Sequence, residues 1–297
     1  MKYEWMYQRR GVYRVERMCS ALAVSRSGYY KHAAACRRPA SARECRDAAL
    51  LVSMRTIAAH HQYRYGSPRM TATLRQQGEH CSLNRVARLM AAHGLGARRK
   101  KRYRITTRPD RTAIASPNRL GQRFRITGIN RVWLTDITYI DTAEGWLFLT
   151  AVLDLASRRI VGWSMNTTLE QYGVLQALRQ ALGRRKPSQA LTIHSDRGSQ
   201  YTSHAFRTLL KKHHLTQSMS GTGNCYDNAP MESFFGTLKD ELVHRRHYAT
   251  REEARQSIAD YIELYYNAER IHSALEYRTP IEWERHQSQN INNNTGL

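Results

Sequence analysis

The sequence predicts an α/β protein, in which a helical N-terminal region precedes a larger domain built on a mixed β-sheet. Two observations predict this fold class. Up to residue 97 the apolar residues recur at helical spacing, and from residue 132 onward runs rich in β-branched and aromatic residues alternate with helical stretches. The 297 residues are 41% apolar, which is enough for two or three separate cores.

The first 40 residues have the pattern of a helix-turn-helix. Residues 12–32 predict a helix, a short turn and a second helix that opens at Ser25. We therefore expect a first helix-turn-helix in residues 1–40. The alternative is a small helical bundle with no role in DNA binding.

Residues 41–97 predict a second helical unit of the same kind. Pro68 opens one helix and Ser82 caps the next. On the second of these helices, Arg85 and Arg88 lie on a different face from the apolar residues. We expect it to be a recognition helix on which both arginines contact DNA. The bundle without a DNA role is the alternative here too.

The charge of the chain indicates a polyanionic partner. Lys and Arg number 47 against 24 Asp and Glu, so the net charge is +23, which favours double-stranded DNA. Residues 98–128 are basic, contain two prolines and have no sustained periodicity, so we interpret them as a linker. Its candidate phosphate contacts are Arg98, Arg99, Lys100, Lys101 and Arg102. A solvated linker that binds nothing is the alternative.

Cysteine usage and hydropathy exclude other classes of protein. Five cysteines without a CxxC pair give neither a disulfide framework nor a structural zinc site. A zinc cluster of Cys36, Cys45, His60 and His61 fits ligand spacing poorly. No run approaches the ~18 apolar residues of a membrane helix, and the N-terminus lacks a signal-peptide core. We expect a soluble cytoplasmic protein with reduced thiols and no membrane partner.

The larger domain begins with three predicted strands, VWLTDITYI, WLFLTAVLDL and IVGWSM. A helix over 169–182, a strand LTIHSD, a helix over 203–213 and a short strand TQSMS follow. The loop GTGNCYDNA then leads to a helix over 230–243, and a last helix is expected over 251–267. The order βββαβαβα indicates a mixed sheet with helices against it.

Three carboxylates stand out in this domain. Asp136 lies inside an apolar strand, where a carboxylate is costly to bury unless a metal or a cation meets it. Asp196 ends the strand LTIHSD, at the edge where α/β sheets display ligands. Glu232 lies in the first turn of its helix. Taken singly, turn capping explains Asp196 and the helix dipole explains Glu232, but the three together favour catalysis.

Converging carboxylates repel one another unless divalent cations lie between them, and hard oxygen ligands suit Mg²⁺ or Mn²⁺. Two such ions in one active site activate a water or a 3′-hydroxyl and stabilise the leaving oxygen at phosphorus. Lys239 lies seven residues after Glu232, two helical turns on, so both side chains share one face. We expect Lys239 to bind the phosphate next to the scissile bond, with a solvated surface lysine as the alternative.

Several nearby polar side chains have structural explanations that we prefer to catalytic ones. Asp227 is expected to order its loop, and His194 to orient a neighbour or pack. A salt bridge to Arg158 or Arg159 explains Asp154.

Two further expectations concern aromatic and amide side chains. Trp133, Trp146 and Trp163 alternate with apolar residues in strands and are interpreted as core aromatics rather than base-stacking platforms. Asn228 and Tyr201 are weaker candidates for phosphate contact.

Residues 84–280 resemble the second-frame (OrfB) transposases of insertion-sequence family three, relatives of retroviral integrases. The resemblance is carried by WLTDITY, VLDLASRRIVGWS, HSDRGSQYTS, SMSGTGNCYDNAPMESFFGTLKDEL and YNAERIHSALEYRTP. It implies that Asp136, Asp196 and Glu232 are a DDE triad with Lys239 as its basic residue. It also implies a ribonuclease H-like integrase core, which we place at 129–285, before a polar tail at 286–297 that we expect to be disordered.

The resemblance implies a function and partners as well. We expect metal-dependent DNA cleavage and strand transfer at the inverted-repeat ends of an insertion sequence, through a circular intermediate. Element ends and target DNA are the substrates, a homo-oligomer forms on DNA, and the protein works at the bacterial nucleoid. An upstream first-frame (OrfA) protein or frameshift fusion is an expected partner, since no leucine-zipper heptads occur in the first forty residues.

Two other functions remain as alternatives. A DNA-binding regulator without catalysis would use the helix-turn-helix units, but it has no chemical reason to keep three uncompensated carboxylates. A ribonuclease H-like nuclease would stop at hydrolysis, and the basic N-terminal region disfavours it.

Overall fold

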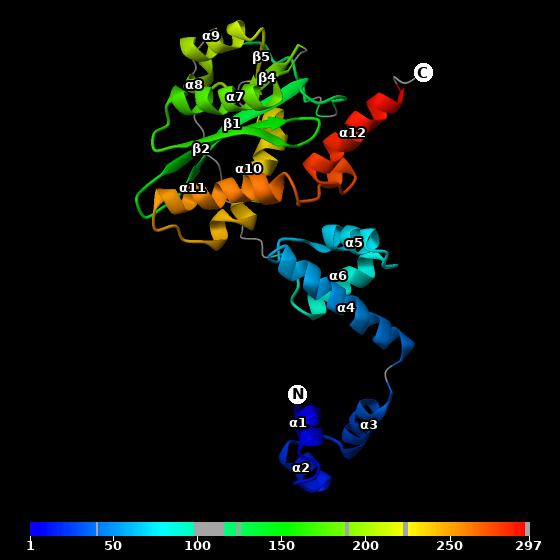
Figure 1. Cartoon of the computed structure of the whole chain (residues 1–297). Coiled ribbons are helices and arrows are strands. Elements are labelled where there is room, and N and C mark those ends of the chain that lie inside the picture. The colour runs from blue at the N-terminus through cyan, green and yellow to red at the C-terminus, as the bar shows by residue number, and fades with distance from the viewer. Residues whose placement is uncertain are drawn as a thin grey trace.

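The computed structural model describes residues 1–39, 41–97, 116–122, 124, 126–187, 190–221 and 225–294. Figure 1 shows three helices at the N-terminal end of the molecule, three more helices in the middle, and a sheet with its covering helices at the other end. The basic stretch from Arg98 to Arg102, expected to contact phosphate, lies outside the described residues.

The first unit contains α1 (Lys2–Gln8), α2 (Val15–Ala21) and α3 (Arg26–Arg37). As expected, the second helix of the helix-turn-helix pattern opens at Ser25, whose hydroxyl accepts a hydrogen bond from the backbone N–H of Gly28. A small core that includes Met6, Met18 and Tyr29 holds the three helices together.

The second unit contains α4 (Ala42–His60), α5 (Ser67–Gln76) and α6 (Leu83–Ala92). Ser41 and Glu44 form a capping box at the start of α4, Pro68 lies in the first turn of α5, and the Ser82 hydroxyl caps α6. The expected helix starts in this unit are therefore confirmed.

The predicted mixed sheet is confirmed. It contains β1 (Val132–Ile140), β2 (Leu147–Asp154), β3 (Ile160–Asn166), β4 (Thr192–Ser195) and β5 (Thr216–Met219), in the spatial order β3-β2-β1-β4-β5. β1 is antiparallel to β2 and parallel to β4, and β4 is parallel to β5. The helices of this domain are α7 (Gln171–Arg185), α8 (Ser199–Thr202), α9 (His204–Lys212), α10 (Ala229–Glu241), α11 (Arg251–Asp260) and α12 (Pro280–Asn294).

The alternation of side chains along β1 sends successive residues into two different cores. Trp133 packs with residues of α7 and α9, whereas Leu134 packs with residues of α10 and α11. In Figure 1 the helices α7 and α10 accordingly lie on opposite faces of the sheet. Gly162 lets α7 approach β3 closely, because a Cβ at this position would lie 2.3 Å from the carbonyl oxygen of Ala177.

The linker expected over 98–128 ends earlier than expected, because its last part contacts the sheet domain. Leu120 is buried in the core beneath α10, and the backbone N–H of Arg119 donates to the Ser218 hydroxyl at 2.9 Å. Leu120, Phe124 and Ile126 pack against this core but show no helical or strand periodicity, which is why the composition indicated a linker.

The tail expected to be disordered from residue 286 is helical as far as Asn294, within α12. Thr279 and Glu282 exchange capping hydrogen bonds at the start of this helix. The buried Glu284 then forms ion pairs with Arg159 and Arg185. An anchored first turn allows a polar sequence to continue as helix, because propagation is easier than nucleation.

The last expected helix, 251–267, is α-helical only as far as Asp260, after which its backbone hydrogen bonds follow the π-helical pattern. α11 ends there and a π-helical turn covers Tyr261–Tyr266. Tyr261, Tyr265 and Tyr266 are all buried in this turn.

Two expectations for single residues are wrong. Asp154 forms its ion pair with Arg185 (3.6 Å) and also accepts a hydrogen bond from the Trp133 indole, while Arg159 pairs with Glu284 instead. Trp146 lies at the exposed start of β2 with half of its surface accessible. The strand alternation that suggested a core position does not extend into the turn before β2.

The α4–α6 unit docks on the sheet domain through the segment just after α4. Arg64 Nε donates to the carbonyl of Glu241 (3.2 Å), the Tyr65 hydroxyl to that of Glu269, and Arg69 Nε to that of Ile271. Within the described part of the chain, no helix is long and apolar enough to cross a bilayer.

Candidate catalytic site

Asp136 and Asp196 lie at matching positions of adjacent parallel strands. The β1–β4 register pairs Val132 with Thr192 and Leu134 with His194. Continued by two residues, the same register sets Asp136 opposite Asp196, directly after the end of β4. Neighbouring strands are ~4.8 Å apart, so the fold brings these two carboxylates to one edge.

Glu232 reaches this edge from α10. Asp136 has the same parity along β1 as Leu134, whose side chain packs in the core under α10. Met231 and Phe235, on either side of Glu232, are buried in that core and fix the first turn of α10 against the sheet. Glu232 itself remains exposed to solvent.

The charges of Asp196 and Glu232 both act on Asp136, so the three carboxylates lie in one region. The pKa of Asp136 is raised to about 8, first by burial and then by the charges of Asp196 and Glu232, while a hydrogen bond from the backbone N–H of Ile137 and the charge of Lys239 act to lower it. Burial also raises the pKa of Asp196 and of Glu232. Carboxyl groups whose ionised forms are disfavoured together are suited to a divalent cation, which would restore their charge.

The three carboxylates lie in one region, but their oxygen atoms do not all lie within 4.8 Å of one another. Within the described residues, the His/Cys/Asp/Glu groups whose ligand atoms all lie within 4.8 Å of one another are Glu4–His32–Cys36 and His60–His61–Glu269. The triad carboxylates are therefore more widely spaced than the side chains of these two groups. Its donor set of carboxylate oxygens alone nevertheless fits Mg²⁺ or Mn²⁺ better than a softer metal.

The zinc cluster considered for Cys36, Cys45, His60 and His61 does not form. Cys36 lies on α3 beside His32, whereas His60 ends α4 beside Glu269. The 19-residue helix α4, about 28 Å long, extends between these two places.

Lys239 lies next to the carboxylates, as its spacing from Glu232 predicts. Burial lowers the pKa of its ammonium group and the charge of Asp136 raises it. The Nζ atom stands 4.8 Å from the centre of the Tyr139 ring. The ammonium group thus lies over an aromatic face and is close enough to Asp136 to be affected by its charge.

Asp196 is oriented by the turn that follows it. The backbone N–H of Gly198 donates to Asp196 Oδ1 at 2.9 Å. Tyr201, a weaker candidate for phosphate contact, is 1% exposed, and its hydroxyl lies 3.3 Å from that of Thr135. Tyr201 therefore supports the strands from beneath and does not contact phosphate.

Loop-ordering contacts surround the start of α10. Asp227 accepts hydrogen bonds from the Asn118 side chain and from the backbone N–H of Gly221, both at 2.8 Å, as its expected role requires. His194 is fully buried between the hydroxyls of Ser218 and Ser220, which confirms a packing role. The contribution of Asn118 was not foreseen, because it lies in the segment interpreted as linker.

Asn228 is buried, and neither of its side-chain amide atoms has a hydrogen-bond partner among the described residues. It immediately precedes α10. Its expected phosphate contact stays a prediction.

Arg85 and Arg88 on α6 both bind Asp47. Their guanidinium groups lie 2.7 Å and 2.6 Å from its two carboxylate oxygens, and hydrogen bonds to both arginines lower the pKa of Asp47. Half of the Arg88 side chain remains exposed. The DNA contact expected of the two arginines stays a prediction, now with a competing intramolecular partner.

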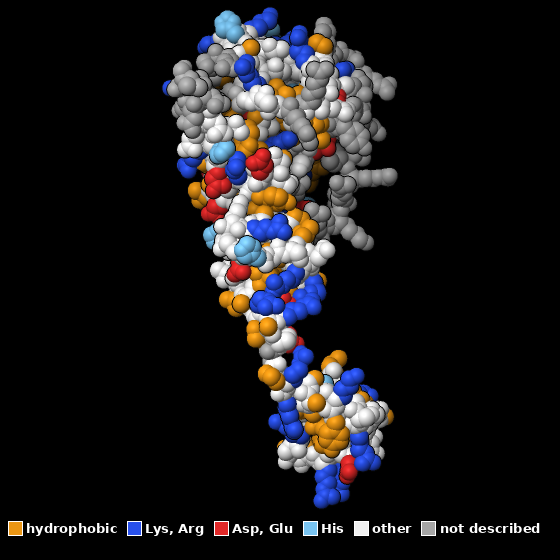
Figure 2. All heavy atoms as spheres, turned by 90° about the vertical axis from the view of Figure 1, so that its right-hand side faces the viewer, with side chains coloured by type: hydrophobic (Ala, Val, Ile, Leu, Met, Phe, Trp, Pro, Cys, Tyr) orange, Lys and Arg blue, Asp and Glu red, His pale blue; other side chains and the backbone are white. Residues whose placement is uncertain are grey.

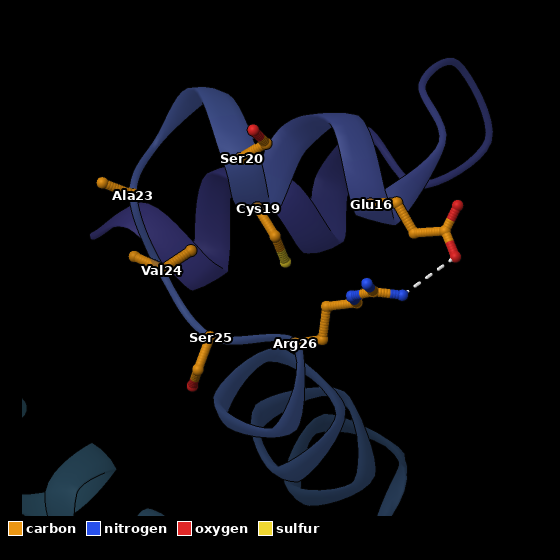
Figure 3. Close-up of a pocket in the computed structure, with 7 residues that line it drawn as sticks. All are labelled: Glu16, Cys19, Ser20, Ala23, Val24, Ser25 and Arg26. Atoms are coloured by element: carbon orange, nitrogen blue, oxygen red, sulfur yellow. Dashed lines mark hydrogen bonds and ion pairs between the residues drawn. The ribbon is translucent and has the colours of Figure 1, made fainter.

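The charged surface is predominantly basic. On the face drawn in Figure 2, blue Lys and Arg side chains outnumber red Asp and Glu from the N-terminal unit to the sheet domain. Figure 3 shows the hollow at the turn between α2 and α3, where Arg26 forms an ion pair with Glu16 at 3.1 Å. This hollow lies in a different unit from the carboxylates.

The chain matches family models over most of its length. A model described as an HTH-like domain matches residues 44–103, and two models described as an integrase core domain match residues 127–225 and 213–280.

Close relatives are transposases. The chain is 42% identical over 236 residues to the transposase for insertion sequence element IS904 of Lactococcus lactis, covering 79% of this chain and 93% of that protein. It is 37% identical over 284 residues to transposase InsF for insertion sequence IS3A of Escherichia coli K12, covering 96% and 98%.

Solved structures with a similar arrangement include two retroviral integrase cores. The catalytic core domain of HTLV-2 integrase is 17% identical, with a TM-score of 0.40, and the match covers 53% of this chain and 97% of that one. The catalytic core domain of BIV integrase is 16% identical, with a TM-score of 0.41, covering 55% and 99%.

Proposed function

Because this chain belongs to the family of insertion-sequence IS3 transposases, we propose that Asp136, Asp196 and Glu232 are the residues with which it cleaves and joins DNA. The chain is a DDE transposase, a polynucleotidyl transferase with an integrase core, and its chemistry depends on a divalent metal. The observation that carries the assignment is the β1–β4 register, which sets Asp136 opposite Asp196 on the edge that α10 covers.

The three carboxylates would hold Mg²⁺ or Mn²⁺, two ions per site. When bound, the ions supply an activated water or 3′-hydroxyl and stabilise the leaving oxygen at phosphorus. The residues of the chain position the carboxylates and the substrate. The Gly198 N–H orients Asp196, buried Met231 and Phe235 fix the start of α10, and Lys239 binds the phosphate beside the scissile bond.

DNA is bound outside the carboxylates by the helical units. Residues 1–40 and 41–97 are proposed as helix-turn-helix domains, with Arg85 and Arg88 as contacts and the basic residues from Arg98 to Arg102 as further phosphate contacts. We place the catalytic core at 129–285. The element ends and target DNA are bound by a homo-oligomer at the nucleoid, with an OrfA protein or fusion as a further partner.

The test is cleavage of labelled element-end DNA by purified protein. Wild type with Mg²⁺ is expected to nick and join the DNA, whereas Asp136→Asn and Glu232→Gln abolish both steps and leave DNA affinity within a few-fold, because one neutral amide barely alters a +23 surface. Asp240→Asn, on the exposed side of α10, is the matched control and should cut normally. A triad variant that still cuts removes that residue from the assignment.

Metal removal gives a second readout. Chelation by EDTA should stop cleavage without releasing the DNA, and added Mg²⁺ or Mn²⁺ should restore cleavage. Binding without cleavage under all metals leads to a repeat with the OrfA segment fused. If the fusion is also inactive, the chain is a DNA-binding regulator.

The basic stretch is tested by salt dependence. Changing Arg99, Lys100 and Lys101 to Ala should flatten the slope of log affinity against log salt by up to about 0.9 per lost phosphate contact. An unchanged slope returns the stretch to a plain linker.

A further inference from the structure

Two large aromatic side chains stand exposed beside the candidate catalytic site. Tyr139 is 56% exposed and Trp146 is 50% exposed. Their ring centroids are 5.1 Å apart and the ring planes are 82° apart, an edge-to-face contact that leaves more ring face open than stacking would. Neither ring is needed to fill a core, so packing does not explain their position.

Tyr139 and Asp136 have opposite parity along β1, so Lys239 rather than the strand links the pair to the catalytic edge. Tyr139 follows Asp136 by three residues along β1, about 10 Å. Lys239 joins the two places, since its ammonium group lies over the Tyr139 ring and is also close enough to Asp136 to sense its charge. A DNA strand with a phosphate on Lys239 would therefore pass over Tyr139.

A second cation lies beside the pair. Arg251, at the start of α11, donates from Nε to the carbonyl oxygen of Trp146 (3.2 Å), and its backbone N–H donates to Glu144. Exposed aromatic rings next to cations are the combination that binds single-stranded nucleic acid, because the cations follow the backbone while bases stack on the rings.

We propose that Tyr139 and Trp146 form a stacking platform for an unpaired base of the strand being cut, next to the phosphate bound by Lys239. This inference rests on the proposed function. A base inside a duplex has no free face, so the platform requires the element end to be unpaired at the site. Cleavage precedes joining in the proposed function, so the element end is the first strand to reach the carboxylates, and we assign the base to the element end rather than to the target.

The experiment measures binding of two DNA probes without added metal, so that catalysis does not enter. One probe is a fully paired element end, and the other is the same end with an unpaired arm that carries 2-aminopurine, whose fluorescence falls on stacking. Wild type should prefer the forked probe and quench it. Trp146→Ala and Tyr139→Ala should each lower that preference about tenfold and abolish quenching, whereas Trp146→Phe retains most of both.

Leu264→Ala is the control, because Leu264 is 65% exposed in the π-helical turn after α11, next to Glu263, which pairs with Arg184 at the end of α7. It should leave preference and quenching unchanged. Equal preference in Trp146→Ala and wild type overturns the proposal, as does an effect on a bubble within target duplex but not on the forked end. Wild type that quenches the fork but cuts nothing with Mg²⁺ keeps the platform and instead counts against the catalytic assignment.

Discussion

His61 shows how a single side chain can tie stability to pH. It is buried at the end of α4, its ring stacks on Tyr65 at 3.9 Å, and within the described residues its Nδ1 atom has no hydrogen-bond partner. Burial, followed by the positive charges of His60 and Arg64, lowers the pKa of His61 from 6.5 to about 4. The folded protein therefore holds this imidazole in its neutral form.

We expect His61→Gln to flatten the loss of stability on acidification. Between pH 6.5 and about 4 the unfolded chain binds a proton at His61 that the folded chain does not, so stability contributed at neutral pH is lost as pH falls through this window. The full loss is up to about 3 kcal/mol. Denaturant unfolding at pH 7, 6 and 5 measures it, with exposed His247→Gln as control. Identical pH slopes in His61→Gln and wild type would rule out this role.

At the level of elements, two glycines have different roles: one allows close packing, and the other only lowers helix propensity. Gly162 on β3 lies against α7, where a Cβ would come within 2.8 Å of the Ala181 backbone nitrogen as well as close to the Ala177 carbonyl. Gly236, inside α10 between Glu232 and Lys239, has open space around it.

The alanine substitutions at these glycines should have opposite signs. Gly162→Ala forces backbone apart and should destabilise the sheet domain by about 1–3 kcal/mol. Gly236→Ala should stabilise it by about 0.5–1 kcal/mol, because Ala loses less backbone entropy than Gly in a helix. Thermal unfolding of the two variants checks both signs. A stable Gly162→Ala would mean that α7 does not pack on β3 this closely.

At the scale of the whole molecule, α10 connects the candidate site to the docked helical unit. Glu232 lies at the start of α10 and Glu241 at its end. The buried Glu241 carboxylate accepts hydrogen bonds from Arg270 at 2.8–3.1 Å and from the Tyr261 hydroxyl at 2.9 Å, while its backbone carbonyl accepts one from Arg64. The docking contacts of the α4–α6 unit therefore meet the helix that positions Glu232.

Arg270→Ala should destabilise the protein by about 3 kcal/mol or more, because it leaves Glu241 buried without its main partner. Denaturant unfolding and limited proteolysis between residues 41–97 and the sheet domain measure the effect. The control is Arg26→Ala, which removes the exposed ion pair with Glu16 and should change stability little. Similar stabilities for the two variants would show that Glu241 is solvated in the folded protein.

The candidate site was largely predictable from the chain. Asp136 stands out because it interrupts an apolar strand, Asp196 because it ends one, and Glu232 with Lys239 because their spacing shares one helical face. Helix starts at Ser25, Pro68 and Ser82 follow from local capping chemistry. Each of these signals depends on residues close together in the chain, so the sequence contains it directly.

Only the tertiary structure decided which side chains meet across long separations. Asp154 pairs with Arg185 rather than with its neighbours, Leu120 joins a distant core, Glu284 anchors a helix in a polar tail, and Trp146 stands exposed beside Tyr139. Periodicity and propensity describe what a segment buries, not what it is buried against. The partners depend on strand order and on which helix covers which face, and those arise from the packing of the whole chain.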